Sequence, residues 1–303
     1  MDLDFVRLEC DIIIDAAVPL DAALYEALRN FESDFKATCC TTLLDSCTFC
    51  RSQKLCPYRM VFGQQLSSDP EIVRLHQKPS LPFSLYINSS EDTISSCTVG
   101  MVVIGSAVSY IGLFHTALLR TVESALHAVL PAPAKFSLCT YSLDYQDSRH
   151  EITHAASLSE SVILLSGQHI LQNTVHSDSV RLSLISPLRL LSNGSIAHRF
   201  DFGLFFRSQL RRCSSMCAYY GSGELDLDFA FLSLAAQNVT VLEDGIHYTQ
   251  PSWTKRLNRA GLTGSVDCVG LVEPMFSLLL LGSYFNAGKG AIFGMGFHKL
   301  EVF

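Results

Sequence analysis

The most constraining feature of this sequence is an order of predicted elements that occurs twice. Apolar alternation and helical periodicity predict strand, helix, strand, strand, helix and strand in each half. The predicted elements of the first half are 5–14, 21–36, 79–88, 97–105, 112–130 and 135–143. Those of the second half are 180–191, with a break at Pro187, then 202–220, 239–247, 264–272, 275–285 and 292–302. The two halves share no sequence identity, so only the order of the predicted elements is repeated.

This order is that of the ferredoxin-like fold, in which a split βαβ unit is used twice. The sequence therefore predicts an α+β chain of two tandem ferredoxin-like (RRM-like) domains. The predicted first domain is 1–143 and carries a cysteine-rich insertion at 39–58. A polar connection, 144–178, with a short strand near Val162, leads to the second domain, 179–303.

Composition limits the compartment and the partners. The chain has 303 residues, of which 48% are hydrophobic and 17% charged, as expected for a folded protein with two sizeable cores. No apolar run reaches the roughly 20 residues that span a bilayer, and the acidic start M-D-L-D-F-V-R is no signal peptide. We expect a cytoplasmic protein without a membrane partner.

The net charge of −7 argues against a generic nucleic-acid coat, so any nucleic-acid site must be local. One local excess of positive charge lies within 252–299, and a second lies on one predicted helix. The residues of the first are Lys255, Arg256, Arg259, Lys289 and Lys299, and those of the second are Arg207, Arg211 and Arg212. The alternative for each is a solvated surface.

A glycine-rich stretch near the C-terminus is the strongest candidate for a phosphate contact. Gly288, Lys289 and Gly290 follow the last predicted helix, and Gly294 and Gly296 open the last predicted strand. Glycine tolerates positive φ and has no Cβ, so its backbone can approach a phosphate closely. Dinucleotide and Walker loops run from strand to helix, whereas this one runs from helix to strand. The alternative is a plain helix-to-strand turn.

Eleven cysteines in a cytosolic chain indicate metal or reduced thiols before disulfides. Four of them, Cys40 (or Cys39), Cys47, Cys50 and Cys56, could hold a closed structural zinc. Only the pair Cys47 and Cys50 has knuckle spacing, and reduced thiols packed in the insertion are the alternative. Cys213 and Cys217, four apart on a predicted helix, are expected in the core.

Several stretches carry a family resemblance. The tail N-A-G-K-G-A-I-F-G-M-G-F-H-K-L resembles the glycine-rich loop of the RAMP superfamily, the RNA-binding proteins of CRISPR systems. The stretches S-P-L-R-L-L, F-R-S-Q-L-R-R and S-W-T-K-R-L-N-R-A-G-L-T-G-S agree in order. Near the N-terminus, C-x2-C-x5-C-P-Y-R-M-V-F followed by L-P-F-S-L looks like the cysteine-bearing branch of the CRISPR repeat-processing endoribonucleases.

This resemblance implies a metal-independent cut of RNA, in which a ribose 2′-hydroxyl attacks the adjacent phosphate and leaves a 2′,3′-cyclic phosphate. That reaction needs a base, an acid and a cation, and no catalytic cofactor. Family members often carry a histidine on or just after the first helix, whereas residues 1–73 here contain none. His76 is the nearest substitute, with a surface histidine as the alternative, and Tyr25 and Arg29 could supply a hydroxyl and a phosphate clamp.

The resemblance also predicts the partners. Gly288, Lys289, Gly290, Gly294 and Gly296 would contact the RNA together with Lys255, Arg256 and Arg259. His298 shares strand parity with Leu300 and is expected in the core. Two functions follow: an endoribonuclease that matures CRISPR repeat RNA, or a non-catalytic subunit that holds the crRNA within a CRISPR effector complex.

Overall fold

The computed structural model describes residues 3–16, 18, 20–41, 47, 50, 55–89, 96–153, 158–249 and 259–303. It forms two compact units. The N-terminal unit comprises Phe5–Pro82 and Ile87–Leu164. The C-terminal unit comprises Leu165–Phe303 together with Met1–Asp4 and Phe83–Tyr86.

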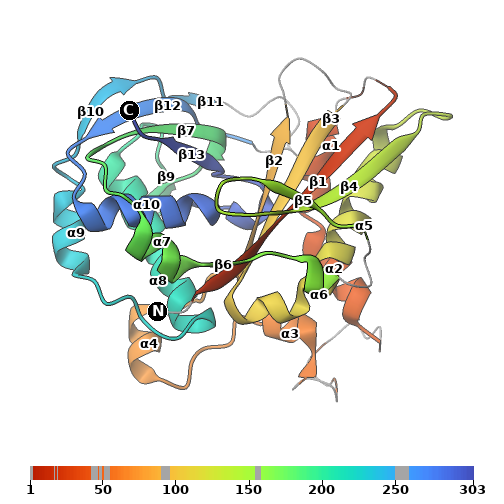
Figure 1. The fold of residues 1–303 in the computed structure, drawn as a ribbon, viewed down its shortest axis with the longest axis horizontal. Coiled ribbons are helices and arrows are strands. Elements are labelled where there is room, and N and C mark those ends of the chain that lie inside the picture. The colour runs from red at the N-terminus through yellow and green to blue at the C-terminus, as the bar shows by residue number, and fades with distance from the viewer. Residues whose placement is uncertain are drawn as a thin grey trace. The chain divides into compact units, whose positions relative to one another are not determined.

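Figure 1 shows the helices and strands of both units. The strands are β1 (Asp4–Ile14), β2 (Phe83–Ser89), β3 (Ser96–Ile104), β4 (Phe136–Leu143), β5 (Arg149–Glu151), β6 (Leu164–Ser166), β7 (Ser179–Leu188), β8 (Leu191–Ser192), β9 (Ser195–Ile196), β10 (Thr240–Asp244), β11 (His247–Thr249), β12 (Gly261–Val269) and β13 (His298–Glu301). The helices are α1 (Leu20–Leu28), α2 (Phe31–Cys39), α3 (Pro57–Phe62), α4 (Pro70–Leu75), α5 (Ile111–Val129), α6 (Leu158–Ser161), α7 (Gly167–Asn173), α8 (Phe202–Tyr220), α9 (Phe229–Ala235) and α10 (Glu273–Tyr284), with 3-10 turns at Gly105–Tyr110 and Ala291–Phe293.

The first sheet has the strand order β2-β3-β1-β4-β5, and β1 pairs antiparallel with both β3 and β4. Strands 1 to 4 in the order 2-3-1-4 make the ferredoxin-like sheet, to which β5 is added at one edge. The side chains of β1 alternate in burial. Those at Leu8, Cys10 and Ile12 are fully buried, and those between them are more exposed. One face of the strand is therefore covered, and the other is open.

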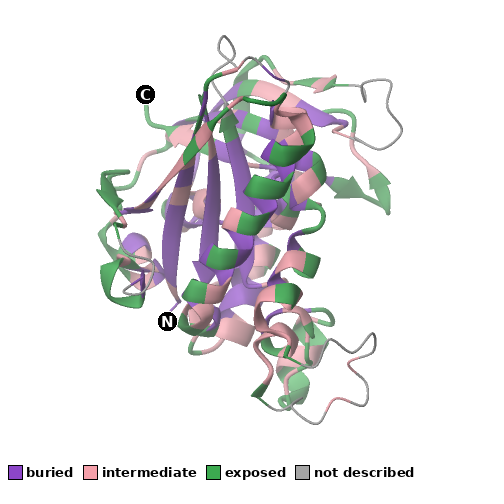
Figure 2. Cartoon of the chain, turned by 90° about the vertical axis from the view of Figure 1, so that its right-hand side faces the viewer, coloured by how far each residue is buried: buried purple, intermediate pink, exposed green. Residues whose placement is uncertain are grey.

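Helix α5 supplies an apolar stripe to this core. Its buried residues recur every three or four positions, as on a helix with one face against a core. Phe114 on this stripe packs against Phe31 and Phe35 of α2, with ring centroids 6.2 Å and 4.8 Å away. Figure 2 shows this arrangement of buried strands and of helices with exposed outer faces.

The second sheet has the order β10-β12-β7-β13, and β12 and β13 both pair antiparallel with β7. It repeats the 2-3-1-4 order with α8 and α10 as its two long helices. The predicted α+β class with two tandem ferredoxin-like plans is thus confirmed. The predicted insertion at 39–58 lies in good part outside the described residues.

Three predicted elements were wrong in extent. The predicted helix 21–36 is two helices, α1 and α2, because Asn30 (φ −94°, ψ 0°) leaves the helical conformation. The predicted strand 239–247 is split into β10 and β11 around Gly245, whose amide donates a hydrogen bond to the Ser265 carbonyl. The predicted strand 292–302 shrinks to β13, since Gly294 and Gly296 within it have positive φ, a conformation outside the β region.

The predicted break at Pro187 was also wrong, because β7 runs through it to Leu188. Proline cannot donate to a strand ladder. Pro187 lies beyond Leu184, the last residue of β7 that pairs with β13, and at a register shift of β12. No neighbouring strand therefore needs a hydrogen bond from a backbone amide at Pro187.

No helix among the described residues is long and apolar enough to cross a membrane.

Candidate nucleic-acid interface

The glycine-rich loop of the C-terminal unit connects α10 to β13. Five of its residues have positive φ: Asn286 (56°), Gly288 (71°), Gly290 (93°), Gly294 (84°) and Gly296 (69°). This run folds the chain into a compact loop with one 3-10 turn at Ala291–Phe293.

Close packing explains two of the glycines. A Cβ on Gly288 would lie 2.3 Å from the carbonyl oxygen of Arg189, and one on Gly296 would lie 1.9 Å from that of Ala287. Both distances are far below van der Waals contact, so only glycine fits. These glycines bring the loop onto the end of β7, where the amide of Lys289 donates to the Arg189 carbonyl at 2.8 Å.

Several backbone amides of the loop already form hydrogen bonds within the protein. The amide of Gly296 donates to the carbonyl of Pro187 at 3.0 Å, and the amides of Phe293 and Met295 donate to Gly290. Gly294 and Gly296 are buried. The predicted donation of glycine amides to a phosphate is therefore excluded for Gly296 in this conformation, and that residue shapes the loop instead.

The loop is accessible at Lys289 and its two flanking glycines, Gly288 and Gly290, and also at Phe293. Lys289 is exposed, and the two glycines are half-buried. Among the residues that the structure describes, the amides of these two glycines form no backbone hydrogen bond. A cationic side chain thus lies between two unpaired amides, a combination that suits a phosphate oxygen.

Asn286 holds the loop from beneath. Its side chain is fully buried, and Nδ2 approaches three carbonyl oxygens: Leu85 at 2.7 Å, and Ala291 and Met295 at 3.3 Å. Two of these carbonyls belong to the loop and the third to β2. A single amide group therefore fixes both ends of the turn.

His298 supports the loop from β13. It is 1% exposed, which confirms the predicted core position. Its Nδ1 lies 2.9 Å from the carbonyl oxygen of Gly296, which can only accept, so Nδ1 carries the proton. Nε2 then accepts from Nε2 of Gln209 at 2.8 Å. Burial lowers the pKa of His298 to about 4 and keeps the ring neutral.

The predicted basic residues have different environments. Lys255 and Arg256 lie outside the described residues, and Arg259 is half-buried. On α8, Arg211 is exposed. Arg212 donates to the carbonyls of Phe285 (2.8 Å) and Phe83 (3.1 Å), so its guanidinium is held by hydrogen bonds inside the C-terminal unit. Burial lowers the pKa of Arg212 to about 10.

Arg189 is a contact residue of the loop that was not predicted from the sequence. Its carbonyl accepts from Lys289, and its Nε donates to the Ala260 carbonyl at 2.6 Å, next to Arg259. It thereby joins the glycine-rich loop to the start of β12. The signal was present in the stretch S-P-L-R-L-L, whose arginine directly follows β7.

The predicted catalytic residues lie in the N-terminal unit. Tyr25 on α1 is 9% exposed, and Arg29 just past this helix is exposed. His76 is half-buried at the end of α4, where its amide donates to the Ile72 carbonyl at 2.8 Å. Their catalytic roles stay predictions.

The cysteines of the insertion form no disulfide in the described part of the chain. Cys39 lies near Cys40 and Cys56, and burial raises its pKa. Among the described side chains, no three or more His, Cys, Asp or Glu residues are placed to hold a metal ion. Residues 42–46, 48–49 and 51–54 between them lie outside that description. Zinc at Cys40, Cys47, Cys50 and Cys56 stays a prediction. Cys213 and Cys217 are fully buried, as predicted.

The fold and this site define a class of proteins built from two ferredoxin-like units with a glycine-rich loop after the last helix. Residues 182–297, which include the whole loop, match the family model of the CRISPR-associated endoribonuclease Cas6. A second family model, AF_1859_N, described as an N-terminal domain, matches residues 3–155. The C-terminal part of the chain is thus similar to the Cas6 family.

Several solved structures are similar to the chain in their fold. The structure of Thermus thermophilus Cas6 (TTHB231) has a TM-score of 0.54 at 13% identity, covering 99% of both chains. A Cas6 (TTHA0078) substrate mimic complex has a TM-score of 0.51 at 14% identity, covering 98% of this chain and 99% of that one. A partial Cas6-RT-Cas1--Cas2 complex has a TM-score of 0.57 at 11% identity, covering 99% of this chain and 46% of that one. No curated protein matches the chain.

Proposed function

We propose that this chain is an endoribonuclease that binds the repeat of a CRISPR RNA precursor and cuts it to mature guide RNA. The observation that carries the proposal is the glycine-rich loop, which presents exposed Lys289 between two half-buried glycines inside the segment that matches the Cas6 family. Two similar solved structures, a Cas6 product complex and a Cas6 substrate mimic complex, support the proposal.

The proposed reaction is attack of a ribose 2′-hydroxyl on the adjacent phosphate. A base removes the hydroxyl proton, the 2′-oxygen bonds phosphorus, and the bond to the 5′-oxygen of the next nucleotide breaks. An acid returns a proton to that oxygen. The products are a 2′,3′-cyclic phosphate and a 5′-hydroxyl. The proposed reaction, with these two proton transfers, needs no metal.

His76 is the proposed base, because it is partly accessible and is the first histidine in the chain. Arg29, which is exposed, would stabilise the charge that develops on the phosphate. Tyr25 is the proposed acid. The proposed RNA contacts are the glycine-rich loop with Lys255, Arg256 and Arg259.

One observation favours the second function, a non-catalytic crRNA-binding subunit of an effector complex. No histidine precedes His76, and Tyr25 is largely buried, so the first helix offers little accessible acid–base chemistry. A similar solved structure is a Cas6-RT-Cas1--Cas2 complex, which is a larger assembly. In this case the chain would hold the repeat and leave cleavage to another protein.

A cleavage assay separates the two functions. The purified chain is incubated with its own repeat RNA in EDTA, beside His76→Ala and beside His127→Ala as a histidine control on the outer face of α5. We expect one cut that leaves a 2′,3′-cyclic phosphate, at least a hundredfold slower in His76→Ala. Tight binding without a cut would establish the second function. An unchanged rate in His76→Ala would refute the assigned base.

For the cysteines we propose a structural zinc that stabilises the insertion and takes no part in cleavage. Metal analysis of the purified protein tests this directly. About one zinc per chain, lost in Cys47→Ser and retained in Cys217→Ser, is expected. A chain purified without zinc but folded and active would refute it.

A further inference from the structure

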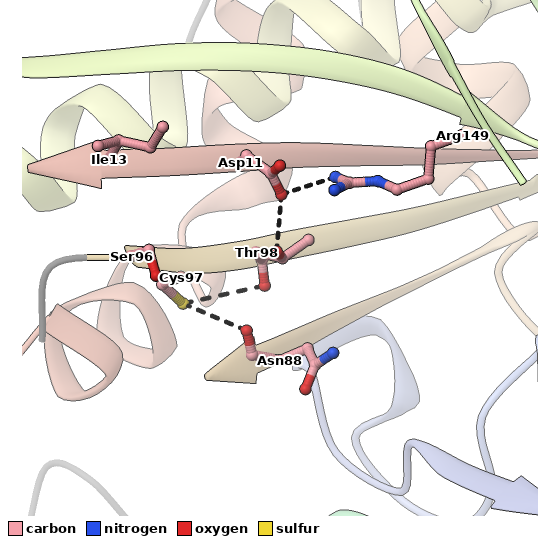
Figure 3. A pocket seen from close by; sticks show the side chains of 7 residues that line it. All are labelled: Asp11, Ile13, Asn88, Ser96, Cys97, Thr98 and Arg149. Atoms are coloured by element: carbon pink, nitrogen blue, oxygen red, sulfur yellow. Dashed lines mark hydrogen bonds and ion pairs between the residues drawn. The ribbon is translucent and has the colours of Figure 1, made fainter. Parts of the chain in front are cut away.

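A cavity of about 360 Å³ opens on the N-terminal unit (Figure 3). It is lined by residues of β1, β2, β3 and β5. These are Asp11, Ile13, Asn88, Ser96, Cys97, Thr98 and Arg149. Its volume lies at the small end of the roughly 300–1,000 Å³ range of small-molecule sites.

An ion pair fixes one wall of this cavity. Asp11 on β1 lies directly opposite Thr98 on β3. The Thr98 hydroxyl and Nη2 of Arg149 both donate to Oδ1 of Asp11 at 2.7 Å. These two donors lower the pKa of the Asp11 carboxyl against the opposing effect of burial, so the group is ionised at neutral pH.

Arg149 is itself held in place by the sheet. It reaches over the neighbouring strand β4 with its guanidinium carbon 4.0 Å from the centroid of the Tyr141 ring. Its Nε lies 3.2 Å from Glu9 while Nη2 contacts Asp11. A stacked guanidinium with two carboxylate partners is rigid, so the wall is preorganised.

The wall leaves hydrogen-bonding capacity unused. Oδ2 of Asp11 has no partner among the described residues, and neither do the side chains of Asn88 and Ser96. Asn88 and Ser96 are exposed at the cavity. The cavity therefore offers an ionised acceptor beside neutral donors and acceptors, with apolar Ile13 at its end (Figure 3).

The charge of this cluster selects the kind of ligand. Two carboxylates, Glu9 and Asp11, face one guanidinium, Arg149, so the group carries a net negative charge. Such a site repels a phosphate. It suits a neutral ligand that brings N–H groups to Oδ2 of Asp11 and an acceptor to Asn88.

We propose that this cavity binds one unpaired nucleobase, guanine in preference to the others. Guanine carries two adjacent donors, N1–H and the N2 amino group, which can share Oδ2 as a common acceptor, and O6 as the acceptor beside them. The proposal rests on RNA being the substrate. It assigns a base-reading site, in contrast to the phosphate-contacting loop.

Binding of short RNA tests the assignment. The probes are three heptaribonucleotides of adenosine whose central position is adenosine, guanosine or inosine, which lacks the N2 amino group. We expect guanosine to bind roughly tenfold more tightly than adenosine, with inosine between them. Asp11→Asn turns the free acceptor into a donor and should abolish the preference. Asp244→Asn, on exposed β10, is the matched control and should retain it.

Asn88→Ala keeps the test decisive if Asp11→Asn does not fold, because Asn88 is exposed and takes no part in the ion pair. It should reduce the preference for guanosine severalfold. Equal affinity for the three heptamers, or a preference that survives both variants, would overturn the assignment while repeat-RNA binding still stands. If neither the heptamers nor the repeat RNA bind, the proposed function fails and the base site with it.

Discussion

Nε2 of Gln209 on α8 lies 2.8 Å from Nε2 of His298 on β13, and both side chains are buried. The other ring nitrogen of His298 contacts the Gly296 carbonyl, so the pair links the core of the C-terminal unit to the glycine-rich loop. A proton on Nε2 of His298 would turn this acceptor into a donor and remove the hydrogen bond from Gln209.

The first prediction concerns acid stability. The pKa of His298 is lowered from 6.5 to about 4 in the folded chain by burial. Between these values the unfolded chain binds a proton that the folded chain does not, so stability falls as pH drops from about 6.5 to 4. The loss from this group is at most roughly 3 kcal/mol. Denaturant unfolding at pH 7, 5.5 and 4.5 measures it.

His298→Phe should remove this part of the pH dependence. Gln209→Met is the control, since it removes the partner and leaves the titrating group buried, and it should retain the slope. A wild-type curve that is flat across this range, or an unchanged slope in His298→Phe, would show that His298 is not the buried neutral group described.

The second prediction compares two glycines with positive φ. Gly194, at the turn between β8 and β9, has φ 81° and open space around its Cβ position, so Gly194→Ala should cost only about 1–2 kcal/mol. Gly296 has φ 69°, and its Cβ would lie 1.9 Å from the Ala287 carbonyl. Gly296→Ala should cost more than about 4 kcal/mol. Similar losses in urea unfolding would contradict the close approach.

The third prediction concerns two adjacent arginines of α8. Arg212→Met removes two hydrogen bonds to carbonyls of Phe285 and Phe83 and should destabilise the chain by about 2–4 kcal/mol. Arg211→Met, at an exposed position, should change stability by less than about 0.5 kcal/mol. Thermal unfolding of both variants gives the comparison. Equal melting temperatures would mean that Arg212 is not structural.

The sequence predicted the order of elements correctly because each long strand and helix has its own apolar period. It could not predict the break at Asn30, since neither glycine nor proline marks it and the apolar pattern continues through Phe31. Pro187 was overvalued as a breaker, because the missing ladder partner on β13 is a property of the assembled sheet.

The site was predictable in part. Four glycines around one lysine mark the loop in the sequence, but the burial of Gly296 depends on carbonyls of Ala287 and Pro187. Arg149 and Asp11 are 138 residues apart, and only the pairing of β5 with β4 and of β4 with β1 brings them together. No local sequence pattern predicts an ion pair between residues so far apart in the chain.

The most direct test of the central claim is the salt dependence of repeat-RNA binding by Lys289→Ala. Wild type, Lys289→Ala and Lys135→Ala, an exposed lysine of the N-terminal unit, are titrated with the same repeat RNA between about 50 and 200 mM salt. If Lys289 contacts a phosphate, Lys289→Ala should bind more weakly, and its slope of log affinity against log salt should be shallower by about 0.7. Lys135→Ala should match wild type. An unchanged affinity and slope in Lys289→Ala would contradict the account.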